Sequence, residues 1–473
     1  MASKTEAKAL RKFGIVDKLA YAAGDFGCNM SFGLKSYLTI FWTQFMGIDQ
    51  VLMAGLLLLV QVWDAINDPI IGAMVDTDKH HYKRNKFLAY INVGGWGLLV
   101  GGAMCFIPWQ GAPAMAKNIL FVAGYIIWDA FYTVANVPYG SLLGMITDDP
   151  TGRAQLSTWR NVGACVAGIL TGIILPYLIY DATNNMMGNR LFWIALILGG
   201  VGVVSFQYLV RKTVIRVDAD VKVGEDAPKF NVLTACKNFM RNRAIVGITL
   251  AIVVGFIQFY GASTAMTVMF QSYFHNVQIS GLLGYLSYVG IFLYVPFIGK
   301  ITPKLGKKEG SVLCAVGMCI SYGLLFVLPI TPDGKGLALY TLCMVLGAVA
   351  GGYYNCINMA MVSDAIDYGE WKFGERNEGT NYALHSFFRK LAQGVFPSAG
   401  ILLATWLGYD ATLGADQPMA VASNMRYLVA GLYLLTAVLT LISVGLIYNL
   451  DKKTMATVTT DLEKRHAMQK QEG

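Results

Sequence analysis

Two carboxylates and an amide lie within about one turn of each other in an apolar segment. Asp64 and Asp68 are four residues apart, and Asn67 is three residues from Asp64, so a helix would place all three on one side. Two acids this close repel each other unless a proton or a metal cation lies between them. Carboxylate and amide oxygens without His or Cys suit a hard ion such as Na⁺. The pattern predicts a cation site, with the hydroxyl of Thr133 from another apolar segment as a candidate further ligand.

A competing interpretation is that these acids cap a helix or form an ion pair with a base such as Lys390. An unpaired charge at the centre of a membrane helix costs at least about 2.5–3.5 kcal/mol. Two acids, an amide and the following Pro69 are more polar features than packing alone requires. Asn67 and Thr133 offer neutral oxygens that a proton would not need, which favours Na⁺ over H⁺. We therefore expect a coupling ion, Na⁺ or H⁺, and no other cofactor.

A second set of polar and aromatic residues falls near the middle of other apolar segments. Sugars need donors and acceptors around their rims and flat apolar surfaces against their faces. A single buried Asn more commonly joins two helices, and a buried His can do the same. Taken together, however, the set resembles a polyol site, and its candidate members are Tyr21, Asn29, Asn136, Arg160, Asn355, His385, Ser386 and Lys390.

The composition shows which kind of protein must position these residues. Charged residues make up 14% of the 473 residues and hydrophobic residues 55%, and the mean hydropathy is +0.50. A soluble domain has about 25% charged residues. The composition excludes a disordered scaffold, a disulfide-stapled secreted domain and a soluble enzyme of ordinary composition. The eight cysteines show no CxxC spacing and most lie in apolar runs, so we interpret them as small core residues.

Apolar stretches long enough to cross a bilayer recur along the whole chain. A hydrocarbon core about 30 Å thick needs around 20 apolar residues per helix, and the longer stretches should tilt or kink. The sequence predicts an all-α membrane protein with twelve transmembrane helices in two six-helix bundles. The expected spans are 18–46, 50–76, 87–109, 117–147, 154–181, 189–211, 243–274, 279–303, 310–330, 337–366, 379–408 and 424–449.

Basic residues lie mainly before the first span, in alternate loops and after the last span. By the positive-inside rule, both termini are expected in the cytoplasm. The net charge of +8 is then a property of these loops, and we expect no nucleic-acid partner. The first apolar segment is too long, and too interrupted by Asp25 and Asn29, for a cleavable signal peptide.

The longest polar interval divides six spans from six. Short basic loops follow the second and the eighth span, and segments that are first acidic and then basic follow the fourth and the tenth. A duplicated six-helix unit of this kind is typical of a secondary transporter. The expected parts are an N-terminal bundle at 1–212, a cytoplasmic middle loop at 213–242, a C-terminal bundle at 243–450 and a cytoplasmic tail at 451–473.

Three motifs are also recognisable together: WDAINDPIIG at 63–72, NVPYGSL at 136–142 and SDAIDYGEWKFGERNEG at 363–379. With KLAYAAGDFGCN from Lys18 and LGYD ending at Asp410, the chain resembles the glycoside–pentoside–hexuronide:cation symporters, the family of the melibiose permease, over nearly its whole length. The resemblance implies a major-facilitator fold and the inward transport of sugar with Na⁺, H⁺ or Li⁺ by alternating access.

The resemblance assigns the family's cation site to Asp64, Asn67, Asp68 and Thr133. It assigns the sugar-site lysine to Lys390, with Ser386 as its polar neighbour. The family's arginine in the fifth helix corresponds to Arg160, although a one-residue gap would put Asn161 there instead.

Two differences from the melibiose permease bear on the substrate. Asn29 and Asn136 stand where that carrier has sugar-binding aspartates, and Gly140 stands where it has a stacking tryptophan. These changes make the expected site roomier and more electropositive. Melibiose is therefore disfavoured, and a glucuronide and a xyloside or related oligosaccharide remain equal candidates.

A set of charged residues on the cytoplasmic side is expected to form a breakable inner gate, with ordinary interfacial solvation as the rival interpretation. Its members are Asp148, Asp149, Arg153, Asp364, Asp367, Glu370 and Arg376.

Two other classes of protein were weighed. A membrane-embedded enzyme would need a polar domain for a nucleotide donor, and the sequence shows no such domain and no Gly-rich phosphate loop. A nontransporting sugar sensor on the same fold remains the alternative. The expected partners are a glycoside, a monovalent cation and the bilayer, and the expected state is a monomer.

Overall fold

The computed structural model is helical throughout the part of the chain that it describes. Apart from one isolated β-bridge between Tyr180 and Met186, no pairing of extended segments occurs there. The described residues are 11–472 except 79, 81, 83, 148, 217–236, 238, 285 and 375–377. The all-α prediction is confirmed.

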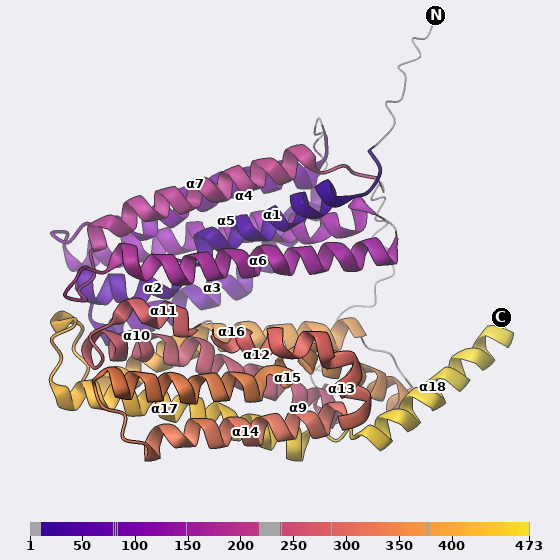
Figure 1. Ribbon diagram of the computed structural model, residues 1–473. Coiled ribbons are helices and arrows are strands. Elements are labelled where there is room, and N and C mark those ends of the chain that lie inside the picture. Colours follow the sequence, from indigo (N-terminus) through magenta and orange to yellow (C-terminus); the bar gives the residue numbers. More distant parts are fainter. Residues whose placement is uncertain are drawn as a thin grey trace, which may run out of the picture. The chain divides into compact units, whose positions relative to one another are not determined.

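Two compact units make up the chain. Unit 1 comprises Met1–Ile48, Leu59–Asp181 and Met186–Ala227, and unit 2 comprises Asp49–Leu58, Ala182–Asn185 and Pro228–Gly473. The helices of the first half are α1 (Ile15–Phe32), α2 (Lys35–Ile40), the π-helix η1 (Phe41–Phe45), α3 (Gln50–Thr77), α4 (Lys86–Cys105), α5 (Ala114–Ile146), α6 (Pro150–Ile179) and α7 (Gly188–Lys212), shown in Figure 1.

The second half forms a further series of helices. They are α9 (Arg243–Phe256), η2 (Ile257–Gly261), α10 (Ala262–Ser272), α11 (Val277–Gly284), α12 (Leu286–Tyr294), η3 (Val295–Phe297), α13 (Ile298–Leu305), α14 (Lys307–Val327), α15 (Gly334–Phe373), α16 (Glu378–Trp406), η4 (Ala411–Leu413), α17 (Met419–Ile442), η5 (Ser443–Ile447) and α18 (Lys452–Glu472).

Each of the twelve predicted spans overlaps one helix or one run of consecutive helices. Nine of the described helices or runs are long and apolar enough to cross a membrane. The other three runs are α1 to η1, α3 and α16, and each contains charged residues.

The exposed side of α3 is apolar, as expected of a helix that contacts lipid. Val62, Ile66 and Ile70 follow one another every four residues and are 61%, 50% and 52% exposed, whereas Asn67 is 1% exposed. A helix in lipid turns its apolar side outward and its polar side toward neighbouring helices. Asn67 therefore faces the inside of unit 1.

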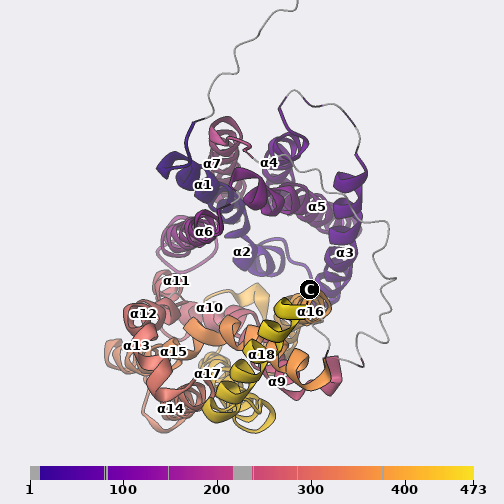
Figure 2. The same ribbon diagram turned by 90° about the vertical axis from the view of Figure 1, so that its right-hand side faces the viewer.

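Within unit 1, α4 packs against α5 and α7, and α1 packs against α6 and α7. Figure 2 shows these helices nearly end on. The contact between α4 and α5 is close because glycines face the α5 backbone. A Cβ atom on Gly94 would lie 2.7 Å from the Ala135 nitrogen, and one on Gly101 would lie 2.6 Å from the Trp128 Cα. Small residues let membrane helices approach in this way.

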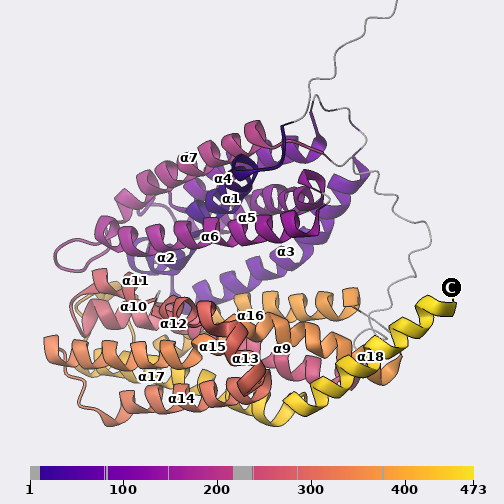
Figure 3. The ribbon, with the colours of Figure 1, turned by 45° about the vertical axis from the view of Figure 1, so that its right-hand side comes forward.

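The tail at 451–473 contains a helix, α18, which packs against the end of α15 (Figure 3). The indole nitrogen of Trp371 donates to Asp461 Oδ2 at 3.0 Å, and Arg465 donates to the Trp371 carbonyl at 3.1 Å. Val458 of α18 is fully buried. Trp371, in the middle of the motif at 363–379, is therefore in contact with the tail.

We expect Gly94→Ala and Gly101→Ala to destabilise the protein, each by about 1–3 kcal/mol, because the added methyl groups would collide with backbone atoms that cannot move alone. Gly144→Ala on α5 is the matched control, since a Cβ there meets nothing within 4 Å. The removal of a flexible glycine should make that variant neutral or slightly stabilising. Thermal unfolding of the purified variants in detergent measures the difference. Equal midpoints for all three variants would contradict the close contact.

Candidate functional site

A polar cluster in unit 1 joins α3 to α5. Asn67 Nδ2 donates to Thr133 Oγ1 at 3.0 Å and lies 3.5 Å from the Asp129 carbonyl oxygen. Thr133 Oγ1 in turn donates to that carbonyl at 3.3 Å, one turn back along α5. Asn67 and Thr133 are each 1% exposed. The structure thus brings together two of the residues that the sequence analysis assigned to a cation site.

Asp64 lies one turn from Asn67 on α3 and is half-buried. Its Oδ2 atom accepts from Gln61 Nε2 at 2.8 Å. The side chain of Asp68, the fourth predicted ligand, lies outside the described residues. The cation-binding role of the four residues remains a prediction.

Asp129 belongs to this cluster although the sequence analysis did not select it. Its side chain is 3% exposed, and its Oδ2 atom has no hydrogen-bond partner in the part of the chain that the structure describes. Asp129 interacts electrostatically with Asp64 and with Lys35 of α2. A charged residue inside an apolar span is itself a signal of function. That rule, applied to the spans 18–46 and 117–147, would have found both Lys35 and Asp129.

A second cluster in unit 1 surrounds Arg160 of α6. Its Nε atom lies 3.4 Å from Asp25 Oδ1 of α1, and its NH2 nitrogen donates to Asn136 Oδ1 of α5 at 3.3 Å. The guanidinium carbon lies 4.9 Å from the centre of the Tyr139 ring. Tyr21 and Tyr139 pack with ring centres 4.6 Å apart. Flat rings beside polar donors and acceptors are what a sugar site requires.

The predicted sugar residues of the first half are therefore partly brought together. Tyr21, Asn136 and Arg160 share this cluster, whereas Asn161, the competing position, is exposed. Asn29 donates to the Asp25 carbonyl oxygen on its own helix at 2.8 Å. Its side-chain nitrogen is thus used within α1.

Asp25 changes the electrostatics expected of this cluster. The sequence predicts a more electropositive site, because Asn29 and Asn136 replace two carboxylates and Arg160 and Lys390 are kept. In the structure, the Asp25 carboxylate, one turn before Asn29, lies beside the Arg160 guanidinium. The cluster in unit 1 is close to neutral.

The predicted sugar residues of the second half lie on α15 and α16 of unit 2. The His385 side chain is 2% exposed, and its Nδ1 atom lies 3.0 Å from Thr249 Oγ1 of α9. This contact between helices is the alternative that the sequence left open for His385. Asn355 is exposed and Lys390 half-buried, and the side chain of Ser386 lies outside the described residues.

The hydrogen bonds of the predicted gate residues that the structure describes are with neighbours in the same unit. Asp364 of α15 accepts two hydrogen bonds from Lys307 Nζ of α14, at 2.8 and 2.7 Å. Asp149 accepts from the Gly152 nitrogen at the start of α6, and Arg153 Nε donates to the Thr147 carbonyl. Asp367 and Glu370 are half-buried on α15. Asp148 and Arg376 lie outside the described residues, and the gating role stays a prediction.

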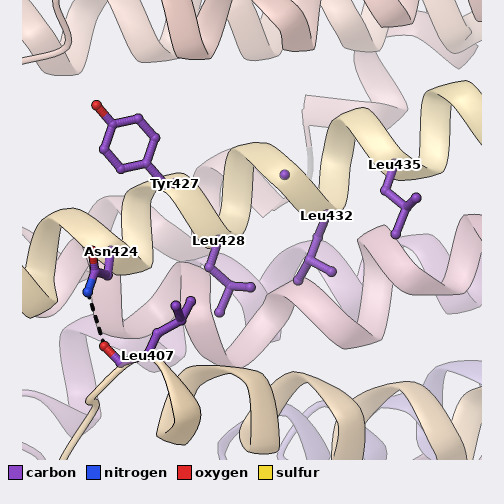
Figure 4. A pocket seen from close by; sticks show the side chains of 7 residues that line it. Leu407, Asn424, Tyr427, Leu428, Leu432 and Leu435 are labelled. Carbon is purple, nitrogen blue, oxygen red and sulfur yellow. Dashed lines mark hydrogen bonds between the residues drawn. The ribbon is translucent and has the colours of Figure 1, made fainter.

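A shallow apolar groove along α17 is unsuited to sugar. Figure 4 shows Leu428, Leu432 and Leu435 along one side of this helix. The groove has one amide, Asn424, which already donates to the Leu407 carbonyl at 3.1 Å. Such a lining offers a sugar ring few hydrogen-bond partners.

Comparison with known proteins identifies the family. A family model described as MFS/sugar transport protein matches residues 20–452. The chain belongs to this family. It is therefore a multi-pass membrane transporter of the major-facilitator type rather than an enzyme, and the resemblance to the glycoside–pentoside–hexuronide symporters is confirmed.

Curated relatives match over nearly the whole chain. An uncharacterized symporter of Bacillus subtilis is 28% identical, with 96% of each chain covered. An isoprimeverose transporter of Lactiplantibacillus pentosus is 28% identical, with 96% of this chain and 92% of the relative covered. A glucuronide carrier protein homolog of Escherichia coli is 24% identical, with 96% of each chain covered. Together they make this protein a sugar transporter.

Solved structures show the same fold at low identity. A bacterial homolog of the human lysosomal transporter Spinster aligns with a TM-score of 0.62 at 16% identity, covering 94% of this chain and 97% of that one. A bacterial homologue of the iron transporter ferroportin aligns with a TM-score of 0.63 at 12% identity, covering 91% and 98%. These likenesses support the fold alone.

We expect Arg160→Gln to destabilise unit 1 by about 1–3 kcal/mol, because it leaves the Asp25 carboxylate without its charged partner. Asp25→Asn combined with Arg160→Gln should recover much of this loss, since no unpaired charge remains. Arg190→Gln, at an exposed position in the first turn of α7, is the control. Thermal unfolding in detergent reports the comparison. A double variant no more stable than Arg160→Gln would argue against an energetically coupled pair.

Proposed function

We propose that this sugar transporter is a symporter that imports a glycoside together with a monovalent cation, with Na⁺ favoured and H⁺ as the alternative. The observation that supports it most is the hydrogen bond between Asn67 and Thr133, with the Asp64 carboxylate one turn away on α3. Neutral and charged oxygens from two helices are then close together, as a hard cation needs.

The cluster also suggests how ion binding would favour sugar binding. A cation near Asp64 would neutralise a carboxylate that burial disfavours, and it would draw ligands from α3 and α5 toward one point. Thr133 and Asn136 are three residues apart on α5, so they lie on the same side of the helix about 4.5 Å apart along its axis. The ion would thus fix the segment that presents Asn136 to Arg160. By linkage, each ligand should tighten binding of the other.

For the substrate we propose a neutral xyloside or related oligosaccharide first, and a glucuronide second. The balanced pair of Asp25 and Arg160 removes one reason to expect an anionic sugar. The relative that transports isoprimeverose agrees with a neutral glycoside, and the relative named as a glucuronide carrier homolog keeps the second candidate open. Lys390 in unit 2 would favour the glucuronide.

We expect Asp64→Cys to abolish ion-driven accumulation of sugar, because a neutral side chain no longer attracts the coupling cation. The measurement is uptake of labelled sugar into proteoliposomes under an imposed Na⁺ or H⁺ gradient. Asp416→Cys, an exposed carboxylate before α17, is the control. Full sodium-stimulated uptake by Asp64→Cys would remove this residue from the mechanism. A wild-type protein that binds sugar without accumulating it would instead indicate the sensor.

A panel of xylosides, isoprimeverose, glucuronides and galactosides should identify the substrate. A ligand that binds only the folded state raises the unfolding temperature, by an amount that grows with its concentration relative to Kd. We expect the largest shift with a neutral xyloside, and a larger shift in NaCl than in choline chloride. A glucuronide that gives the largest shift would reverse the proposed order, and the absence of any difference between the two salts would oppose sodium coupling.

A further inference from the structure

Lys35 and Asp129 place two opposite charges beside the predicted cation site, and nothing in the proposed function so far uses them. Lys35 begins α2, directly after the break that ends α1 at Phe32. Asp129 lies one turn before Thr133 on α5. Both residues are in unit 1 and fall within predicted membrane spans, where a charge needs a specific reason to be present.

The carboxylate of Asp129 is almost completely buried and is directed at the cluster. Asp129 is 3% exposed, and its Oδ2 atom has no hydrogen-bond partner among the described residues. Its electrostatic partners include the carboxyl group of Asp64 and the ammonium group of Lys35. A buried carboxyl oxygen without a partner is costly. Asn67 and Thr133 both hydrogen-bond to the backbone carbonyl of Asp129 rather than to its Oδ2 atom. That side-chain oxygen can therefore bind an ion.

The ammonium group of Lys35 stands near these carboxylates without a direct ion pair among the described contacts. Its Nζ atom lies 5.0 Å from the centre of the Phe32 ring and 5.1 Å from that of Tyr125. It interacts electrostatically with Asp129 and Asp64. Two aromatic faces can hold an ammonium ion by cation–π attraction. Lys35 therefore compensates part of the negative charge without forming a direct ion pair with the Asp129 Oδ2 atom among the described contacts.

The net charge of the cluster shows what Asp129 and Lys35 contribute together. Asp64 and Asp129 are the two acids among the described side chains of the cluster. They form no group of three His, Cys, Asp or Glu side chains that could hold a metal, and no such group occurs elsewhere in the described part of the chain. Asp129 adds one negative charge to the site, and Lys35 adds one positive charge. The pair leaves the total charge unchanged and adds one oxygen ligand.

We propose that Asp129 is a further ligand of the coupling cation and that Lys35 is the fixed positive charge that limits this enlarged site to one monovalent ion. The inference rests on the proposed cation coupling. The site would hold Na⁺ between oxygens of α3 and α5, with the Lys35 ammonium in place of a second ion. Without Lys35, the extra carboxylate would strengthen the attraction for Na⁺ and admit a divalent cation.

The test is isothermal titration of the purified, full-length protein in detergent with NaCl, and separately with CaCl₂, in choline chloride at constant ionic strength. Asp129→Asn should weaken Na⁺ binding at least about tenfold, the effect of losing one charged interaction. Lys35→Gln should bind Na⁺ at least about tenfold more tightly, or bind Ca²⁺ where the wild type does not. The double variant should return to within about threefold of the wild type, because the two charges compensate each other.

Lys117→Gln is the matched control, a half-buried lysine on α5 whose Nζ atom donates to the Met46 carbonyl. It should leave Na⁺ and Ca²⁺ binding unchanged. Thermal unfolding and gel filtration of each variant establish that it is folded, and Asp129→Glu, which keeps the charge, should retain Na⁺ binding better than Asp129→Asn.

The outcomes separate this inference from the proposed function. A wild-type protein without measurable Na⁺ binding overturns sodium coupling and this proposal with it. Normal Na⁺ affinity in Asp129→Asn, or weakened Na⁺ binding in Lys35→Gln without rescue in the double variant, overturns the proposal alone. In the last case, Lys35 and Asp129 would be a structural pair.

Discussion

The cost of placing charge in a membrane governs this structure. Each charged side chain inside the bundle needs an opposite charge, a hydrogen-bond partner or a bound ion. In unit 1 the guanidinium of Arg160 is balanced by Asp25, whereas Asp129 keeps an oxygen without a partner. The first arrangement is complete in itself, and the second is suited to receive a cation. The difference separates the cluster that we assign to the sugar from the one that we assign to the ion.

Helix α5 links these two clusters. Asp129, Thr133 and Asn136 follow each other at helical spacing along α5, so their side chains share one side of the helix. Helix α4 approaches this helix closely through Gly94 and Gly101. The proposed ion ligands and the proposed sugar ligand thus lie on one helix. A change at one cluster can reach the other without any long chain of intermediates, which is the simplest physical route to reciprocal binding.

Substrate choice depends on the same balance of charge. Asn29 and Asn136 stand where the melibiose permease has aspartates, which by itself indicates a more positive site. Asp25, however, supplies one carboxylate within a turn of Asn29. A sugar in unit 1 would meet a nearly neutral cluster of amides, rings and a paired arginine. Family members with different named substrates share this fold, so the sugar must be argued from such local charges rather than from the fold.

The sequence alone determined the all-α membrane fold, the positions of twelve apolar segments and the family, because hydropathy over about 20 residues and helical spacing are local properties. Helical spacing also grouped Asp64 with Asn67 and Asp68, and the hydroxyl of Thr133 was a candidate ligand that the resemblance then supported. Only the tertiary structure decided which residues from separate helices meet. It paired Arg160 with Asp25, brought Lys35 and Asp129 to the ion cluster and gave His385 a partner in Thr249. Such contacts depend on how the helices pack and on the rotation of each helix about its axis, and a local sequence pattern does not determine either.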